Sequence, residues 1–113
     1  MRVIVCGGRT YGNRWRVVDT LDAIHAATPI TVLIHGNAHG ADNLADDWAM
    51  GKCETLTFSP LWEVHGKSAG PKRNQQMIEA KPDLVVAFPG GRGTADMVRR
   101  AKAAGVPVKQ INS

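Results

Sequence analysis

Short apolar runs alternate with helical stretches along the whole chain. Five runs are rich in β-branched residues and stop at a glycine, a proline or a polar residue, which is typical of strands buried in a parallel sheet. They cover residues 2–6, 30–35, 53–58, 83–88 and 106–111. Strands that alternate with helices predict an α/β fold with right-handed crossovers.

Apolar residues recur at helical spacing between these strands. The clearest helix covers residues 41–50, because its apolar positions fall at i, i+3, i+4, i+7 and i+8 and include Trp48. We also expect helices over 14–27, over 71–80 and after Pro89, the last with Met97, Val98, Ala101 and Ala104 facing inward. Residues 59–69 read as an irregular connection.

These elements predict a Rossmann-like three-layer sandwich. We expect one domain over residues 1–113, with a five-stranded parallel sheet in the order 3-2-1-4-5. In that order the first and fourth strands are neighbours where the winding reverses. A ligand is therefore expected in the crevice outside their carboxyl ends.

The composition is that of a soluble globular protein, with 43% hydrophobic and 21% charged residues. No apolar run reaches the ~20 residues that a membrane span needs, and the chain opens on a strand pattern without a signal sequence. We therefore expect a cytoplasmic protein with no membrane partner. Cys6 and Cys53 both fall in apolar segments, which favours two free and buried thiols.

The net charge of +4 is concentrated in the loops. Residues 7–14 contain two arginines and no acid, and residues 66–75 contain three cations and no acid. A basic domain can bind nucleic acid, but cations on glycine-containing loops favour a compact anion such as a phosphate.

The strongest functional signal is the glycine-rich loop between the fourth strand and the last helix. Unpaired amides and the dipole at a helix N-terminus attract phosphate, and glycines let it approach the backbone. The loop supplies Gly90, Gly91, Gly93 and Thr94. The alternative is a tight turn with a threonine cap. The loop after the first strand adds Gly7, Gly8 and Arg9 but matches neither the dinucleotide nor the P-loop fingerprint.

Further candidates lie near the same sheet edge. Lys72, Arg73 and Asn74 begin the third helix and could hold a phosphate or carboxylate, although Lys72 also fits a solvated helix end. Gly36 follows the second strand, and Asp42, in the first turn of the next helix, could accept ribose hydroxyls or simply be stabilised by the helix dipole.

Other side chains give weaker signals. Trp62 could stack on a base or fill a gap beneath its loop. Cys6 and His35 could meet at strand ends, but core packing is the better interpretation. The histidines and cysteines lack the spacing of a zinc site, so we expect no metal, and nothing indicates a resident cofactor.

The motifs together resemble the DUF2493 (YspA-like, cpYpsA-related) proteins of the SLOG superfamily, over nearly the whole chain and in order. The matching segments are Gly7-Gly8-Arg9, His35-Gly36 with Gly40-Ala41-Asp42, Trp62 with Gly66 to Asn74, and Phe88 to Asp96. The resemblance implies a Rossmann-like fold and a site for nucleotides or their derivatives, ADP-ribose-like ligands among them. It also implies a homo-oligomer, because proteins of this superfamily often pair.

The same superfamily contains the LOG phosphoribohydrolases, related to lysine-decarboxylase-like proteins. Their Pro-Gly-Gly-x-Gly-Thr-x-x-Glu motif supplies a catalytic glutamate, and an arginine comes from an upstream helix. Arg73 resembles that arginine, but the glutamate position is Met97, with Asp96 one residue earlier. Leu61 also stands where the YspA-like proteins carry an acid before the tryptophan.

Three functions follow in order of preference. The first is a binding module that senses, carries or sequesters a nucleotide-derived ligand. The second is an N-glycosidic nucleoside-phosphate hydrolase, in which Arg73 holds the phosphate and Asp96 or Asp42 steadies positive charge on the ribose. The third, single-stranded nucleic-acid binding, is the least favoured, because the chain has six aromatic residues and no basic stripe between them.

Overall fold

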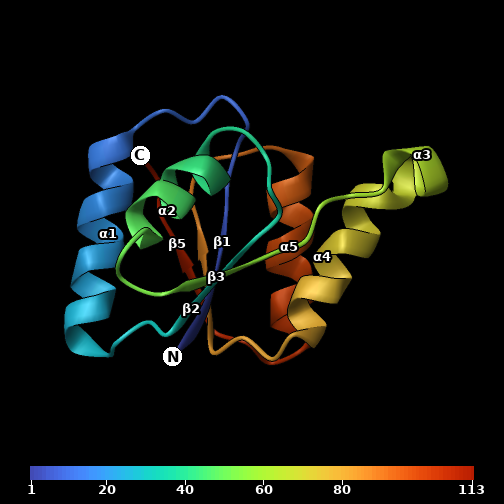
Figure 1. Ribbon diagram of the computed structural model, residues 1–113. Helices are drawn as coiled ribbons and strands as arrows, with labels where there is room; N and C mark the ends of the chain where they lie inside the picture. The colour runs from blue at the N-terminus through green and yellow to red at the C-terminus, as the bar shows by residue number, and fades with distance from the viewer.

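A computed structural model describes all of residues 1–113. Its five-stranded parallel sheet has the order β3-β2-β1-β4-β5, as the sequence predicts. The strands are β1 (Arg2–Cys6), β2 (Val32–His35), β3 (Glu54–Thr57), β4 (Leu84–Ala87) and β5 (Val108–Gln110). The sheet is the middle layer of a Rossmann-like α/β sandwich (Figure 1).

Each face of the sheet is covered by a pair of helices. On one face lie α1 (Arg14–Ala27) and α2 (Ala41–Ala49), and on the other α4 (Ala69–Glu79) and α5 (Arg92–Ala103). Two apolar clusters result because alternate residues of a strand point to opposite faces. Val3 and Val5 belong to the first cluster, Ile4 and Cys6 to the second. None of the helices has the length and hydropathy needed to cross a membrane.

Local signals account for the helix boundaries. Asn13 caps α1, since its side chain accepts a hydrogen bond from the amide of Arg16 at 3.1 Å. Trp48 is only 4% exposed and donates from its indole to Asp22 at 2.8 Å, which fixes α2 against α1. Gly51 follows α2 with a φ of +77°, a conformation that favours glycine.

The segment after β3 differs from the prediction. Residues 59–69 are not wholly irregular, because they contain the helix α3 (Trp62–His65) and the 3₁₀ turn η1 (Gly66–Ser68). Backbone bonds such as His65 N–H to Leu61 C=O and the bond from the Ser68 hydroxyl to the His65 carbonyl hold the short helix, and no apolar periodicity predicts it. The segment 61–68, called the arm below, projects from the body of the molecule (Figure 1). The next helix begins at Ala69 and includes Pro71 in its first turn.

Two expectations about burial are wrong. Cys53 is free, as expected, but only half-buried, because it precedes β3 at an open edge of the sheet. Ala104 is exposed and caps the end of α5, while Met97, Val98 and Ala101 are buried as predicted. Helical periodicity predicts which side of a helix is buried, but it does not predict the residue at which the helix ends.

Candidate functional site

The carboxyl ends of β1 and β4 carry two loops that pack directly on each other. The amide of Gly8 donates to the carbonyl of Pro89 at 2.8 Å, and the carbonyl of Gly8 accepts from the amide of Ala41 at 3.4 Å. The loops after β1, β2 and β4 therefore meet at one point, as the strand order requires.

A cavity of about 510 Å³ opens beside this junction, within the range of small-molecule sites. It is lined by ten of the twelve predicted binding residues, namely Gly7, Gly8, Arg9, Gly36, Asp42, Arg73, Asn74, Gly91, Gly93 and Thr94. Gly90 is not among the residues that line the cavity. Lys72 lies outside, with its Nζ 3.5 Å from Nδ1 of His65.

The glycines around the cavity are of two kinds. A Cβ on Gly90 would lie 2.2 Å from Oγ1 of Thr94, and one on Gly7 would lie 2.6 Å from Cβ of Ala41. These positions need glycine because chain packs against chain there. A Cβ on Gly91 or Gly93 would meet nothing within 4 Å. Among the predicted glycines that line the cavity, only these last two leave room for another molecule to approach the backbone.

The N-terminus of α5 borders the cavity with unpaired amides. The N–H groups of Arg92, Gly93 and Thr94 donate to no acceptor in the chain, and the cap residue Gly91 offers no side chain. The partial positive charge of the helix dipole adds to these three donors. A threonine cap is not formed, so the alternative of a simple capped turn is not what the structure contains.

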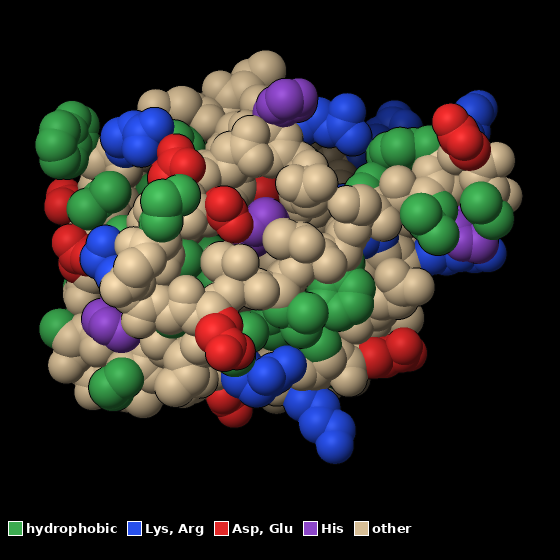
Figure 2. Space-filling view, viewed as in Figure 1, with side chains coloured by type: hydrophobic (Ala, Val, Ile, Leu, Met, Phe, Trp, Pro, Cys, Tyr) green, Lys and Arg blue, Asp and Glu red, His purple; other side chains and the backbone are tan.

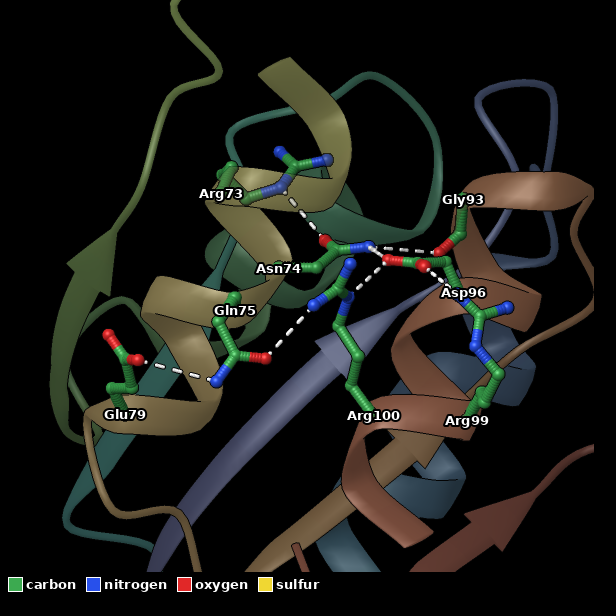
Figure 3. Close-up of polar contacts among 8 residues, drawn as sticks. All are labelled: Arg73, Asn74, Gln75, Glu79, Gly93, Asp96, Arg99 and Arg100. Carbon is green, nitrogen blue, oxygen red and sulfur yellow. Dashed lines mark hydrogen bonds and ion pairs between the residues drawn. The ribbon is translucent and has the colours of Figure 1, made fainter. Parts of the chain in front are cut away.

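Arg73 and Asn74 connect three segments of the site, and Figure 3 shows the bonds that join α4 to α5. Arg73 donates from Nη1 to the carbonyl of Gly36 at 2.6 Å and from Nε to Oδ1 of Asn74 at 3.0 Å. Asn74, only 4% exposed, donates in turn to the carbonyl of Gly93 at 3.1 Å and to Asp96 at 3.0 Å. This chain of bonds holds the N-terminus of α5 against α4 and the loop after β2.

Asp96 is fully engaged by its neighbours. Arg100 donates to its Oδ2 at 2.8 Å, and Arg99 pairs with its Oδ1. Burial alone would raise the pKa of Asp96, but the bonds from Arg100 and Asn74 outweigh burial and lower it. The side chain is therefore a carboxylate with both oxygens occupied. Its spacing from Arg99 and Arg100, at i+3 and i+4 on a helix, is a signal that the sequence already contained.

Asp42 is buried at the start of α2 and shapes the loop before it. Its Oδ2 accepts from the amides of Gly36 at 3.0 Å and Ala38 at 3.2 Å. Burial raises the pKa of Asp42, and these hydrogen bonds and the nearby cations oppose the rise only in part. Its Oδ1 has no partner in the chain, and the residue lines the cavity.

Cys6 and His35 do not form a catalytic pair. His35 is buried and bonds through Nε2 to Asp46 at 2.8 Å, while its Nδ1 accepts from the amide of Asn37. Burial, with a smaller contribution from the Asp42 charge, raises the pKa of Cys6 to about 12. The thiol at the cavity wall is therefore neutral, and the residue packs as the sequence interpretation favoured.

Cations and one aromatic ring border the mouth of the cavity. Trp62, on α3, is 48% exposed and lines the cavity, so it does not fill a gap beneath its loop. The guanidinium carbon of Arg9 lies 5.9 Å from the centre of its ring. Lys67 and Arg92 also line the cavity, in addition to the residues predicted from the sequence. Figure 2 shows lysine and arginine side chains between the body of the molecule and the arm, and on the arm itself.

Two comparisons place the chain among known proteins. A family model described as YspA, cpYpsA-related SLOG family matches residues 1–65. The Gene 61 protein of Mycobacterium phage D29 is 42% identical over 116 residues, covering 95% of this chain and 93% of that protein. The chain belongs to the YspA, cpYpsA-related SLOG family. No solved structure gives a significant match to it.

Membership in the SLOG family suggests a nucleotide-related function and agrees with the resemblance read from the motifs. The family match ends at His65, the last residue of α3, so α4 and α5 lie outside it, whereas the alignment with the phage protein covers 95% of this chain. At the position of the LOG glutamate stands Met97, which is buried and does not line the cavity. The carboxylate that α5 contributes to the cavity lining is instead that of Asp96, one residue earlier.

Proposed function

We propose that the protein binds a nucleotide or nucleotide derivative, ADP-ribose-like or a nucleoside phosphate, in the cavity beside α5. The observation that carries the proposal is the row of three unpaired amides at Arg92, Gly93 and Thr94 next to glycines with open space above them. A phosphate group satisfies such amides and is stabilised by the helix dipole.

Other residues of the cavity can bind the remaining parts of such a ligand, its ribose and its base among them. The guanidinium of Arg73 is held in place by Gly36 and keeps its charge, although burial lowers its pKa. The free Oδ1 of Asp42 can accept a ribose hydroxyl, and the exposed ring of Trp62 can stack on a base. The Cys6 thiol is neutral and both oxygens of Asp96 are paired, so Asp42 is the one carboxyl of the cavity with a free oxygen, which supports sensing, carriage or sequestration over catalysis.

Location and assembly belong to the same proposal. We infer a cytoplasmic protein that binds no membrane and forms a homo-oligomer. Exposed apolar side chains outside the cavity support the oligomer, because Leu56, Leu61 and Val64 are all at least 36% exposed within one short segment.

A charge placed at the N-terminus of α5 tests the binding proposal. Gly93→Glu puts a carboxylate among the free amides, where an acid stabilises the helix but repels a phosphate. Gly12→Glu makes the same change in net charge at a glycine that also has open space and lies outside the cavity. Both variants should fold as the wild type does.

The readout is thermal shift and calorimetry with ADP-ribose, AMP and inorganic phosphate. A ligand at 100 times its Kd should add about 2.7 kcal/mol of stability to the wild type and to Gly12→Glu, and almost none to Gly93→Glu. If no nucleotide stabilises the wild type, or if Gly93→Glu binds as well as Gly12→Glu, the proposal fails.

The hydrolase remains the alternative, with Asp96 or Asp42 as the carboxylate that would steady positive charge on the ribose. Because both oxygens of Asp96 are occupied by Asn74, Arg99 and Arg100, we expect no release of free base from AMP or ADP-ribose. Release of base that disappears in Asp96→Ala would establish the hydrolase instead. Tight binding of a short oligonucleotide that weakens steeply with salt would favour the third function.

A further inference from the structure

The two edges of the sheet are protected to different degrees. At one edge, β5 is preceded by Pro107 and carries Lys109, two features that discourage pairing with another strand. At the other edge, every residue of β3 is exposed, and the strand contains neither proline nor lysine. It crosses in front of the other strands in Figure 1, with no segment covering its outer side.

The backbone of β3 presents unpaired groups to that open side. The amides of Glu54 and Phe58 donate inward, to the carbonyls of Thr31 at 3.3 Å and His35 at 3.0 Å. Because backbone groups alternate in direction along a strand, the N–H and C=O of Thr55 and Thr57 point away from β2. They are free to pair with another strand.

Apolar side chains gather on the same side of the molecule. Six large hydrophobic residues are exposed in the whole chain, and Leu56, Leu61, Trp62 and Val64 lie within the nine residues that begin in β3 and end in the arm. Figure 2 shows hydrophobic side chains exposed between β3 and α4 and again on the arm. A surface of this kind in a soluble domain indicates an interface.

We propose that β3 pairs antiparallel with β3 of a second copy, across a two-fold axis at Leu56, so that the two five-stranded sheets become continuous. The arrangement is self-complementary, because Thr55 of each copy faces Thr57 of the other and both threonines contribute their outward groups. Leu56 meets Leu56 of the second copy, and Glu54 faces Phe58, so no like charges are opposed.

The partner is a second copy, because in this two-fold register the outward backbone groups of Thr55 and Thr57 pair with each other and no like charges are opposed. The inference rests on the homo-oligomer of the proposed function but not on its ligand. No residue of β3 lines the cavity. Assembly and ligand binding can therefore fail separately.

A proline at Thr55 tests the pairing. Thr55→Pro removes an outward N–H and leaves the inward bonds to β2 in place, whereas Thr55→Val keeps the N–H and serves as the control. Light scattering after gel filtration should give twice 12.2 kDa for the wild type and Thr55→Val, and 12.2 kDa for Thr55→Pro. The Thr55→Pro monomer should still be stabilised by ADP-ribose as the wild type is.

A cross-link decides the matter if Thr55→Pro fails to fold. In a pair without mutual hydrogen bonds the two Cα atoms lie about 4.5 Å apart, which allows a disulfide. Leu56→Cys in a Cys53→Ser background should oxidise to a covalent dimer, and Met50→Cys, at a position 73% exposed, should not. A monomeric wild type overturns both the oligomer and this interface. A dimeric Thr55→Pro, or Leu56→Cys that does not cross-link, overturns the interface alone.

Discussion

The guanidinium of Arg73 and the backbone of Gly36 lie in direct contact, with Nη1 2.6 Å from the carbonyl oxygen. Arg73 belongs to α4 on one face of the sheet, and Gly36 follows β2. A Cβ on Gly36 would lie 2.1 Å from Nη1, so this position must be glycine for the arginine to reach the loop. Because Gly36 has no side chain, it leaves room for the half-buried guanidinium of Arg73.

Gly36→Ala should displace the guanidinium of Arg73, lower the stability of the protein and weaken ligand binding. The bond to the Gly36 carbonyl and the bond to Asn74 cannot both survive the move, and the loss of a charged hydrogen bond costs about 1–3 kcal/mol. Urea unfolding gives the loss in stability, and calorimetry with ADP-ribose should show weaker binding. Gly12→Ala is the control, because its Cβ would meet nothing within 4 Å. Equal stability of the two variants would show that the contact does not constrain the loop.

Asn74→Ala should loosen the N-terminus of α5. Asn74 is the only side chain that donates to the Gly93 carbonyl, and its removal also takes a donor from Asp96. We expect a loss of about 1–3 kcal/mol by urea unfolding, together with reduced affinity for ADP-ribose. Gln76→Ala changes an exposed residue of the same helix that makes no side-chain bond, and should be neutral. If Asn74→Ala binds ADP-ribose with wild-type affinity, the hydrogen bonds of Asn74 do not contribute to ligand binding.

The sequence predicts the sheet order and most of the cavity wall, because both follow from where the strands end. Glycine is ambiguous in sequence, since Gly90 is needed for packing and Gly93 for open space, and only the structure separates the two. The sequence alone also does not reveal the roles of buried polar groups. The sequence offers Asp42 as a ribose contact or a partner of the helix dipole, and the structure shows in addition that it holds the Gly36 loop through two backbone amides. Such roles depend on segments that the fold brings together.

Asp42 and Asp96 should make opposite contributions to the pH dependence of stability. The pKa of Asp96 is lowered in the folded protein, so its contribution is present above its ordinary pKa of about 3.8 and is lost as the pH falls through the lowered value. The pKa of Asp42 is raised. Its contribution is therefore present below about pH 3.8 and is lost as the pH rises through the raised value.

Asn substitutions at the two positions measure these contributions. The stability of Asp42→Asn relative to the wild type should rise as the pH increases from about 3.8, and then level off. The stability of Asp96→Asn relative to the wild type should fall between the lowered pKa and about pH 3.8, and stay low above it. Urea unfolding at constant ionic strength across the acid range gives both curves. Parallel curves for the two variants would contradict the opposite environments of the two carboxyls.

The two cysteines should differ in their reaction with iodoacetamide. The thiolate is the reactive form, and with a pKa of about 12 Cys6 ionises at pH 8 to only about one part in ten thousand. Cys6 is also 9% exposed, whereas Cys53 is half-buried at the edge of the sheet. Mass spectrometry of the native protein should therefore find Cys53 alkylated well before Cys6. In urea the rates should become similar, because burial is the main cause of the raised pKa. Equal rates in the native protein would mean that the Cys6 thiol is ionised at the cavity wall, which would reopen the case for a reactive cysteine there.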